Sequence, residues 1–173
     1  MTILAAAALR EGLAVIRQAP ADEGTVELIV RRPAVDAREV VASATTSGEA
    51  ASGDAGPTAG TSCTPRSALM NARTIDLLGG DRGRWPLAGD QLYVDLDLGE
   101  ASLPPGARAF RIGTALLELS ARRTPGAGSS PRGSDEALAF VNSDEGRSPR
   151  LRGANCFVVE GGVVRTGDRV AKA

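Results

Sequence analysis

The clearest pattern in the chain is a strict alternation of apolar and polar positions over residues 90–98. Leu92, Val94, Leu96 and Leu98 fall on one face, and the intervening positions are mostly polar. Because successive side chains of a β-strand point to opposite faces, this spacing predicts a half-buried strand.

Two further segments show strand patterns. Residues 24–33 place Val26, Leu28 and Val30 on one predicted face, with charged positions between them. Residues 109–120 are apolar at positions of both faces, which predicts one strand that is partly buried on both faces. Both segments are bounded by turn-forming residues, as strands in compact domains usually are.

Turn signals divide the rest of the chain. Gly161-Gly162 lies between two short apolar runs, which predicts a hairpin with a two-residue turn. Gly89-Asp90 and Gly167-Asp168 are predicted as turn residues. Residues 43–66 lack periodicity and are rich in Ala, Ser, Gly, Thr and Pro, which is typical of a flexible loop.

Short helices are predicted at three places. Residues 3–18 have leucines and an isoleucine at roughly helical spacing, ending before a proline. Residues 68–80 read as the end of a strand that runs into a short helix stopped by Gly79. Residues 134–142 read as a helix with Ser134 as its N-cap.

Strands without regular helical crossovers predict a mostly β domain, closed or nearly closed into a barrel, with a few short helices. We expect this single domain to span residues 24–172, with the flexible loop at 43–66. Residues 1–20 form an appended N-terminal helix or a tail. The 173 residues are enough for one such domain.

Composition limits the chemistry. The chain has no histidine, which excludes a Ser-His-Asp triad and a histidine-ligated metal. Lys172 is the single lysine, and we expect it to be frayed because it is next to the C-terminus, so covalent pyridoxal phosphate is not expected. The net charge of −1, without a basic stripe or interleaved aromatics, gives nucleic-acid binding no support.

The location expected from the sequence is the cytoplasm. No apolar run approaches the roughly 18–20 residues of a membrane span, and the first residues lack the basic segment of a signal peptide. The two cysteines, Cys63 and Cys156, form no CxxC pair and are expected to be free thiols. We therefore expect no membrane partner; the oligomeric state stays open.

A series of short motifs in a fixed order resembles the MOSC family, the domain found at the C-terminus of molybdenum cofactor sulfurases. No single motif is diagnostic, and the resemblance lies in their order over residues 24–172. The matching stretches are Glu27–Pro33, Leu69–Arg73, Leu87–Leu92 with Asp95–Leu98, Leu103–Gly106, Ile112-Gly113 with Leu117-Glu118, Ala137–Asn142, Gly146-Arg147, Arg150–Asn155 and Val164–Asp168.

This resemblance implies a MOSC-type β-barrel with a site for the molybdenum cofactor or a sulfur-containing ligand. In relatives, a cysteine in a Pro-His-Thr-Gly-Cys-like loop follows the strand that matches Leu116–Ser120. A thiolate suits persulfide transfer and the binding of soft metals. Here the histidine position holds Arg123, and the cysteine position falls near Gly126 or Ala127. Neither residue can carry sulfur.

The resemblance also implies which residues face the ligand. They are polar side chains suited to binding a small anionic or pterin-type ligand. For Asn71 and Arg73, helix capping and a surface salt bridge are the alternative roles. Arg150 and Arg152 would point the same way if extended, with surface solvation or a salt bridge to Asp144 or Glu145 as the alternative. The candidate cofactor-binding residues are Asn71, Arg73, Arg123, Arg150, Arg152 and Asn155.

Three functions remain open. In the first, the resemblance implies a ligand-binding MOSC-type domain that binds molybdenum, with sulfur transfer or reduction as its activity and with impaired catalysis. Alternatively, it is an inert degenerate paralogue that acts as an interaction module. In the third case it is a thiol enzyme that uses Cys63 or Cys156 in place of the family cysteine. Cys156 at the start of a strand is otherwise a small buried apolar residue, and Cys63 an exposed thiol.

Overall fold

The computed structural model describes residues 6–34, 37–47, 62–63, 66–103, 109–120 and 135–173. Its helices are α1 (Ala6–Ile16), α2 (Ala72–Gly79), η1 (Arg82–Ala88, a 3₁₀ helix), α3 (Asp135–Asn142) and α4 (Asp144–Arg147). Its strands are β1 (Glu23–Arg31), β2 (Glu39–Val41), β3 (Ser43–Thr46), β4 (Ser62–Cys63), β5 (Arg66–Asn71), β6 (Leu92–Asp95), β7 (Ala109–Ile112), β8 (Ala115–Leu119), β9 (Ala154–Glu160), β10 (Gly162–Arg165) and β11 (Arg169–Lys172).

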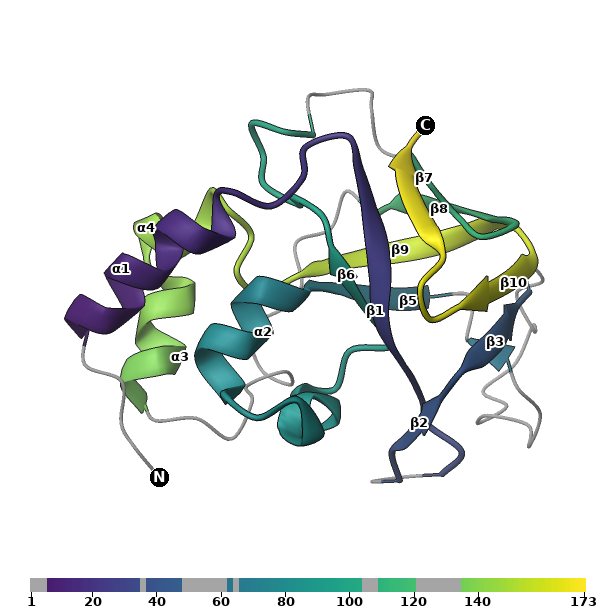
Figure 1. Ribbon diagram of the computed structural model, residues 1–173, viewed down its shortest axis with the longest axis horizontal. Helices are drawn as coiled ribbons and strands as arrows, with labels where there is room; N and C mark the ends of the chain where they lie inside the picture. The colour runs from purple at the N-terminus through teal and green to yellow at the C-terminus, as the bar shows by residue number, and fades with distance from the viewer. Residues whose placement is uncertain (1–5, 35–36, 48–61, 64–65, 104–108, 121–134) are drawn as a thin grey trace.

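Among the described residues, seven strands close into a barrel in the order β1-β6-β5-β9-β8-β7-β11, and β11 pairs back onto β1. All of these pairings are antiparallel except that of β5 with β6. Figure 1 shows β1 and β11 side by side where the barrel closes. The predicted fold class, a mostly β barrel with a few short helices, is confirmed.

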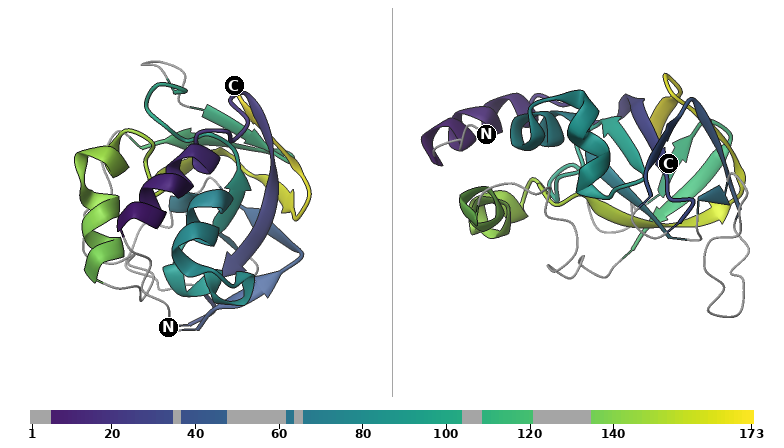
Figure 2. Two further views of the ribbon diagram at one scale, coloured as in Figure 1. Left: turned by 60° about the vertical axis from the view of Figure 1, so that its left-hand side comes forward. Right: turned by 90° about the horizontal axis from the view of Figure 1, so that it is seen from below.

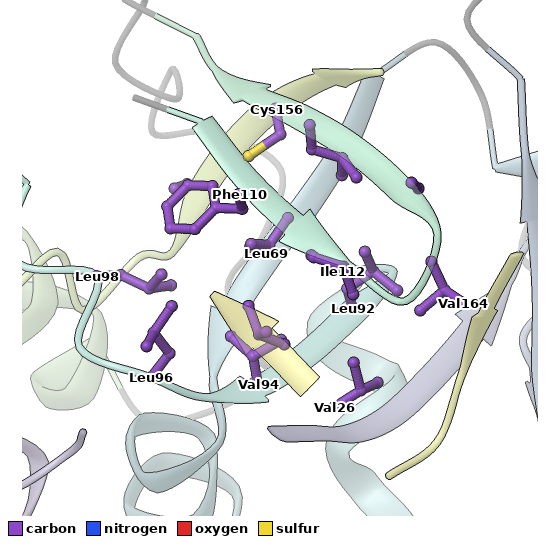
Figure 3. Close-up of a cluster of buried hydrophobic side chains, with 14 of the residues drawn as sticks. Val26, Leu69, Leu92, Val94, Leu96, Leu98, Phe110, Ile112, Cys156 and Val164 are labelled. Atoms are coloured by element: carbon purple, nitrogen blue, oxygen red, sulfur yellow. The ribbon is translucent and has the colours of Figure 1, made fainter. Parts of the chain in front are cut away.

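The barrel interior is filled by aliphatic side chains and Phe110 (Figure 3). The four alternating residues predicted to share a face, Leu92, Val94, Leu96 and Leu98, all lie in this core. With few aromatic residues in the chain, burial of Leu, Ile and Val supplies most of the hydrophobic stabilisation.

The face assignment of β1 was wrong. A register shift against β6 between Val26 and Leu28 inserts a β-bulge. As a result, Val26 and Ile29 point into the barrel, whereas Leu28 and Val30 pack on its outer side. A bulge adds one residue to one strand and reverses the alternation beyond it.

Residues 109–120 form a hairpin and not the predicted single strand. β7 pairs antiparallel with β8, with Ile112 opposite Ala115. Gly113, at φ 56°, forms the two-residue turn with Thr114. A positive φ costs glycine little, so the chain can reverse here.

The hairpin predicted around Gly161-Gly162 was also wrong. β9 is already paired on both edges, with β5 and with β8. β10 therefore leaves the barrel and pairs with β3, placing Gly162 opposite Thr46. β4 extends this second sheet in parallel to β3. β3 and β4 both fall within 43–66, whose residues 48–61 lie outside the described part.

The longer helices gather at one end of the barrel (Figure 2). Leu9, Leu13 and Ile16 of α1 pack with Phe140 and Val141 of α3. The predicted N-terminal helix is thus present from Ala6, and its apolar stripe docks onto the domain. The helix predicted at 134–142 is present from Asp135, while Ser134 lies outside the described residues.

A second apolar layer covers the outer face of β1, β5 and β6. It is formed under α2 and η1 by Leu28, Val30, Met70, Ala72, Ile75, Trp85, Ala88 and Tyr93. Lys172 belongs to β11, and its Nζ donates a hydrogen bond to the Ser102 carbonyl oxygen at 2.8 Å. The expectation that this lysine is frayed was therefore wrong.

Candidate anion-binding site

The carboxyl group of Asp90 is the most unusual polar group in the described structure. Its residue is only 3% exposed, and its Oδ2 has no hydrogen-bond partner among the described residues. A buried polar atom without a partner costs about 1–3 kcal/mol, so such an atom calls for an explanation. Asp90 lies in the short connection between η1 and β6, as a turn residue would, and the turn prediction did not foresee the burial of its side chain.

The end of η1 places Asp90 inside. Asp81 caps the start of η1 by accepting a hydrogen bond from the Gly83 amide at 2.9 Å. Gly89 ends η1 at φ 93°, in the left-handed region. A Cβ at Gly89 would lie 2.7 Å from Nη2 of Arg32, so a side chain there would meet the guanidinium. Glycine therefore allows the close approach of Arg32.

Arg32 and Arg38 come together through the pairing of two strands. Arg31 of β1 lies opposite Glu39 of β2, so the residues that follow and precede this pair meet at one end. Arg32 donates a hydrogen bond to the Gly89 carbonyl oxygen. Burial, followed by the charge of Arg38, lowers the pKa of Arg32. Two guanidinium groups this close favour a bound anion.

Arg152 supplies hydrogen-bond donors from another part of the fold than Arg32 and Arg38. It lies two residues before β9, and its Nη1 donates to Oδ1 of Asn142 at 2.8 Å. Its Nε and Nη2 are buried and have no partner among the described residues. The planar guanidinium offers these two N–H groups as a fork that matches two oxygens of one oxyanion.

Electrostatics link these groups. Burial raises the pKa of Asp90 from 3.8 to about 7, and the charges of Arg32 and Arg152 oppose this only in part. The carboxyl group can therefore gain or lose a proton near neutral pH. We call Asp90, Arg32, Arg38 and Arg152 the Asp90 cluster.

An aromatic wall closes the cluster on the η1 side. The Tyr93 hydroxyl donates to the Trp85 carbonyl oxygen at 2.6 Å, and the two rings lie 5.7 Å apart. Burial raises the pKa of Tyr93 well above its ordinary value, so this hydroxyl stays neutral. Trp85 Nε1 is buried without a partner among the described residues. Arg82 covers the Trp85 ring at 5.0 Å.

Comparison with known proteins supports the fold. No family model matches the sequence, and no curated protein matches it. The structure is similar to that of the YuaD protein from Bacillus subtilis, with a TM-score of 0.51 and 20% identity over 86% of this chain and 94% of that one. A hypothetical protein of known crystal structure matches with a TM-score of 0.52 and 18% identity, covering 90% of this chain and 70% of that one.

The structure of YiiM from Geobacillus stearothermophilus has a TM-score of 0.41 and 14% identity, with coverage of 87% and 73%. The chain therefore shares the β-barrel fold of the YuaD protein. At these identities the likeness is one of fold. The function therefore has to be argued from the residues of the site itself.

In this barrel, Asn71 and Arg73 make contacts that hold the fold together. Asn71 is buried; its Nδ2 donates to the Leu96 carbonyl oxygen at 2.7 Å, and its Oδ1 accepts from the Thr74 amide at 3.1 Å. It is thus the N-cap of α2. Arg73 forms a two-bond ion pair with Asp95 and donates to the Val15 carbonyl oxygen.

Arg150 and Arg152 do not alternate along an extended segment. Residues 148–152 form turns, and Arg150 has a φ of 50°. Arg150 Nη1 donates to the Leu98 carbonyl oxygen at 3.2 Å. Of the two arginines, Arg152 is the one whose charge acts on Asp90. The idea that both point the same way was therefore wrong, because their backbone is not extended.

Asn155 lies on the barrel wall near the cluster. It is half-buried in β9 opposite Ala68, and its carbonyl oxygen accepts from the Ser120 amide at 2.7 Å. Gln91, next to Asp90, donates its backbone amide to the Ala68 carbonyl oxygen. Asn155 thus lies in β9, which is separated by β5 from β6, the strand that follows Asp90. Arg123, with Gly126 and Ala127, lies outside the described residues.

Cys156 points into the barrel and away from the Asp90 cluster's aromatic wall. Figure 3 shows its sulfur among core side chains, near Phe110. The residue is 1% exposed, and burial raises the pKa of its thiol to about 12. A thiol that stays protonated is a poor nucleophile and a poor ligand. Cys63 lies in β4, but its side chain is outside the described part.

Among the described residues, no three acidic or cysteine side chains are placed to hold a metal ion. No described helix is both long and apolar enough to cross a bilayer.

Sequence reasoning overlooked three members of the cluster, namely Asp90, Arg32 and Arg38. Two of them lie in stretches that carry the MOSC resemblance, Glu27–Pro33 and Leu87–Leu92. Their place in these motifs was the signal that the sequence offered. The motifs do not show that Asp90 is buried, because its burial depends on the packing of η1 over the start of β6.

Proposed function

We propose that this protein is a MOSC-type domain that binds an anionic, pterin-type ligand related to the molybdenum cofactor and does not itself transfer sulfur. The ligand's phosphate would lie against the Asp90 cluster. The observation that carries the proposal is the half-buried side chain of Arg152, whose buried Nε and Nη2 lack partners among the described residues.

The charges favour an anion at this place. The charges of Arg32 and Arg152 act on the Asp90 carboxyl group, and the charge of Arg38 acts on Arg32. A buried guanidinium with free donors is costly unless an oxyanion completes its hydrogen bonds. A phosphate ester supplies the required charge and three acceptor oxygens.

The described residues fit the phosphate of such a cofactor better than they fit its metal. A soft thiolate would be needed to bind molybdenum as family members are expected to do. The one cysteine side chain that the structure describes, Cys156, is sealed in the barrel core with a raised pKa. No step is therefore assigned to molybdenum, which would arrive, if at all, already bound to the pterin.

At the position of the family cysteine the chain lacks the thiolate that sulfur transfer needs, although it has groups that can bind an anion. Persulfide transfer requires a thiolate that can be reached by its acceptor. The position that aligns with the family cysteine holds Gly126 or Ala127, which have no sulfur. We therefore propose a binding role, as in storage, carriage or recognition of the ligand.

The test is to purify the full chain from a bacterial host that makes the molybdenum cofactor, and to measure released pterin by fluorescence and molybdenum by elemental analysis. We expect pterin in a near-stoichiometric amount in the parent and at least a tenfold loss in Arg152→Gln. Arg147→Gln is the matched control, because Arg147 is exposed and pairs with Asp144 three residues earlier. Absence of pterin from the parent would contradict the proposal.

A further inference from the structure

We propose that β2 and the exposed face of η1 form a docking surface for an extended, acidic segment of a partner protein, which adds as a strand to the open edge of β2. The inference goes beyond ligand binding, because it concerns the outer surface of the barrel. It is carried by an open strand edge, two exposed aliphatic side chains beside that edge, and two arginines that form no ion pair with a described residue.

The open edge belongs to β2. Among the described strands, β2 pairs with β1 alone and is the last strand in the order of its sheet. Figure 1 shows β2 beside the lower end of β1. Backbone N–H and C=O groups along an open edge form a template on which another extended chain can pair.

The register shows which backbone groups of β2 face outward. The Val30 amide donates to the Gln91 carbonyl oxygen at 2.8 Å, on the β6 side of β1. The backbone groups of Val30 therefore point away from β2. Val40 lies opposite Val30, so these two residues form a pair without hydrogen bonds between them. The N–H and C=O groups of Val40 consequently point to the open edge.

Two aliphatic side chains lie beside this edge. Val30 packs against Trp85 and Ala88 of η1, and directly opposite residues of an antiparallel pair project from the same face. Val40 is therefore on the η1 side of β2, where its side chain is 57% exposed. Leu87, next to Ala88 in η1, is 55% exposed. An added strand that covers both would remove this apolar surface from water.

Positive charge flanks the two aliphatic side chains. Arg84 is exposed and lies three residues before Leu87, a spacing at which side chains of a 3₁₀ helix share a face. Arg38 directly precedes β2. Neither arginine forms an ion pair with a described residue. Two guanidinium groups without a carboxylate partner favour an acidic segment over a neutral one.

The surface suits a polypeptide better than nucleic acid or a second copy of the chain. Bases of single-stranded nucleic acid stack on exposed aromatic rings, whereas Trp85 and Tyr93 are buried and the exposed side chains here are aliphatic. A symmetric contact between two copies would bring the arginines of one surface toward those of the other, and like charges disfavour this pairing. An extended acidic peptide satisfies both the strand edge and the charge.

The first experiment is selection of peptides by the full chain from a phage-displayed random library, with each enriched peptide then synthesised with a fluorescent label. We expect the enriched sequences to combine acidic residues with alternating aliphatic ones, because the edge pairs with a strand that presents every second side chain to Val40 and Leu87. No enrichment, or enrichment of sequences without acidic residues, would overturn the inference.

Val40→Pro tests the strand addition. Proline keeps an apolar side chain but removes the N–H that points to the open edge, and the hydrogen bonds of β2 to β1 come from the neighbours of Val40. We expect fluorescence anisotropy to show peptide binding at least tenfold weaker, at a melting temperature close to that of the parent. Val40→Thr is the matched control, since it keeps the N–H and the branched shape, and should bind within about threefold of the parent. Unchanged binding by Val40→Pro would overturn the inference.

A measurement on the parent decides the matter if Val40→Pro does not fold. Because the Val40 amide would donate to the added strand, bound peptide should slow its hydrogen exchange at least tenfold, as measured by nuclear magnetic resonance. Exchange of this amide at the same rate with and without saturating peptide would contradict strand addition.

Arg84→Gln tests the charge. We expect it to weaken binding of the selected peptide by roughly threefold to tenfold at low salt, and to make binding less sensitive to added salt. Arg147→Gln is the control, because Arg147 is an exposed arginine of α4 and should leave binding unchanged. Equal binding by Arg84→Gln and the parent at low salt would overturn the choice of an acidic partner.

This inference and the proposed function can fail separately, because Val40, Leu87 and Arg84 are not members of the Asp90 cluster. Peptide binding by a chain that carries no pterin would uphold the docking surface and contradict the proposed function. A chain that carries pterin but enriches no peptide would do the reverse.

Discussion

Arg73 and Asp95 form a two-bond ion pair that joins α2 to β6, with Nε to Oδ1 at 2.7 Å and Nη2 to Oδ2 at 3.1 Å. Arg73 also donates to the Val15 carbonyl oxygen at 3.1 Å, close to the C-terminal end of α1. One side chain thus ties the barrel wall to two helices. The hydrogen bond to Asp95 raises the pKa of Arg73.

The first prediction concerns this ion pair. Arg73→Ala should lower the free energy of unfolding by about 1–2 kcal/mol, because a half-buried, two-bond pair and a helix contact are lost together. Urea unfolding monitored by circular dichroism measures the change. Arg147→Ala, which removes an exposed pair with Asp144, should cost less than about 0.5 kcal/mol. Similar losses in both variants would speak against a special role for Arg73.

The second prediction uses two glycines with a positive φ. Gly153 has φ 73°, and a Cβ there would lie 2.3 Å from the Leu69 carbonyl oxygen. Gly80 has φ 70°, but a Cβ there would meet nothing within 4 Å. Gly153→Ala should therefore destabilise by at least about 2 kcal/mol more than Gly80→Ala, which pays only for the backbone strain. Equal melting temperatures of the two variants would contradict the close approach of β9 to β5.

The third prediction follows from the titration of Asp90. Its pKa is raised from 3.8 to about 7 in the folded protein, so the folded state binds more protons than the unfolded state between these values. The contribution of the Asp90 carboxyl group to the free energy of unfolding is fully present below pH 4. It is lost as the pH rises to 7, at up to about 1.4 kcal/mol per pH unit. Asp90→Asn should remove this slope and be at least as stable as the parent at pH 8. Urea midpoints at pH 5, 6, 7 and 8 measure it, and an unchanged slope would refute the assignment.

The fourth prediction concerns the buried thiol. In a Cys63→Ser background, Cys156 should react with a thiol reagent at pH 8 only as fast as the barrel opens, because it is 1% exposed and its pKa is about 12. Labelling in urea should be complete within the mixing time of the reagent. Rapid labelling of the native protein would show that the sulfur is accessible and would revive a catalytic role for Cys156.

The sequence was informative where local pattern and tertiary environment agree. The alternation from Leu92 to Leu98 placed four residues in the core, since a strand with one uniformly apolar face has one stable orientation. The helix from Ala6 was visible because its apolar stripe repeats at the helical period.

The sequence was misleading where a single residue changes the geometry or where pairing is decided at a distance. The bulge between Val26 and Leu28 leaves no local mark, yet it exchanges the faces of β1. Gly161-Gly162 has the composition of a hairpin turn, but β3 takes β10 because both edges of β9 are occupied. Competition among strands is a property of the whole fold.

The candidate site shows the same limit. Arg152 was predicted as a ligand-binding residue through the MOSC resemblance, and its charge acts on the carboxyl group of Asp90. Gly89-Asp90 has the composition of a turn, and only the packing of η1 over the start of β6 buries the carboxyl group. A buried charge is therefore hard to predict from local sequence, even when its partners are recognised.

The central claim is that an oxyanion binds between Arg152 and Asp90. A crystal of the full chain soaked in arsenate, which has the shape and the hydroxyl proton of hydrogen phosphate, tests it through the anomalous signal of arsenic. We predict a peak with oxygens within hydrogen-bond distance of Arg152 Nε and Nη2 and of Asp90 Oδ2. A map without arsenic at this place, or with Arg152 capped by another part of the chain, would contradict the account.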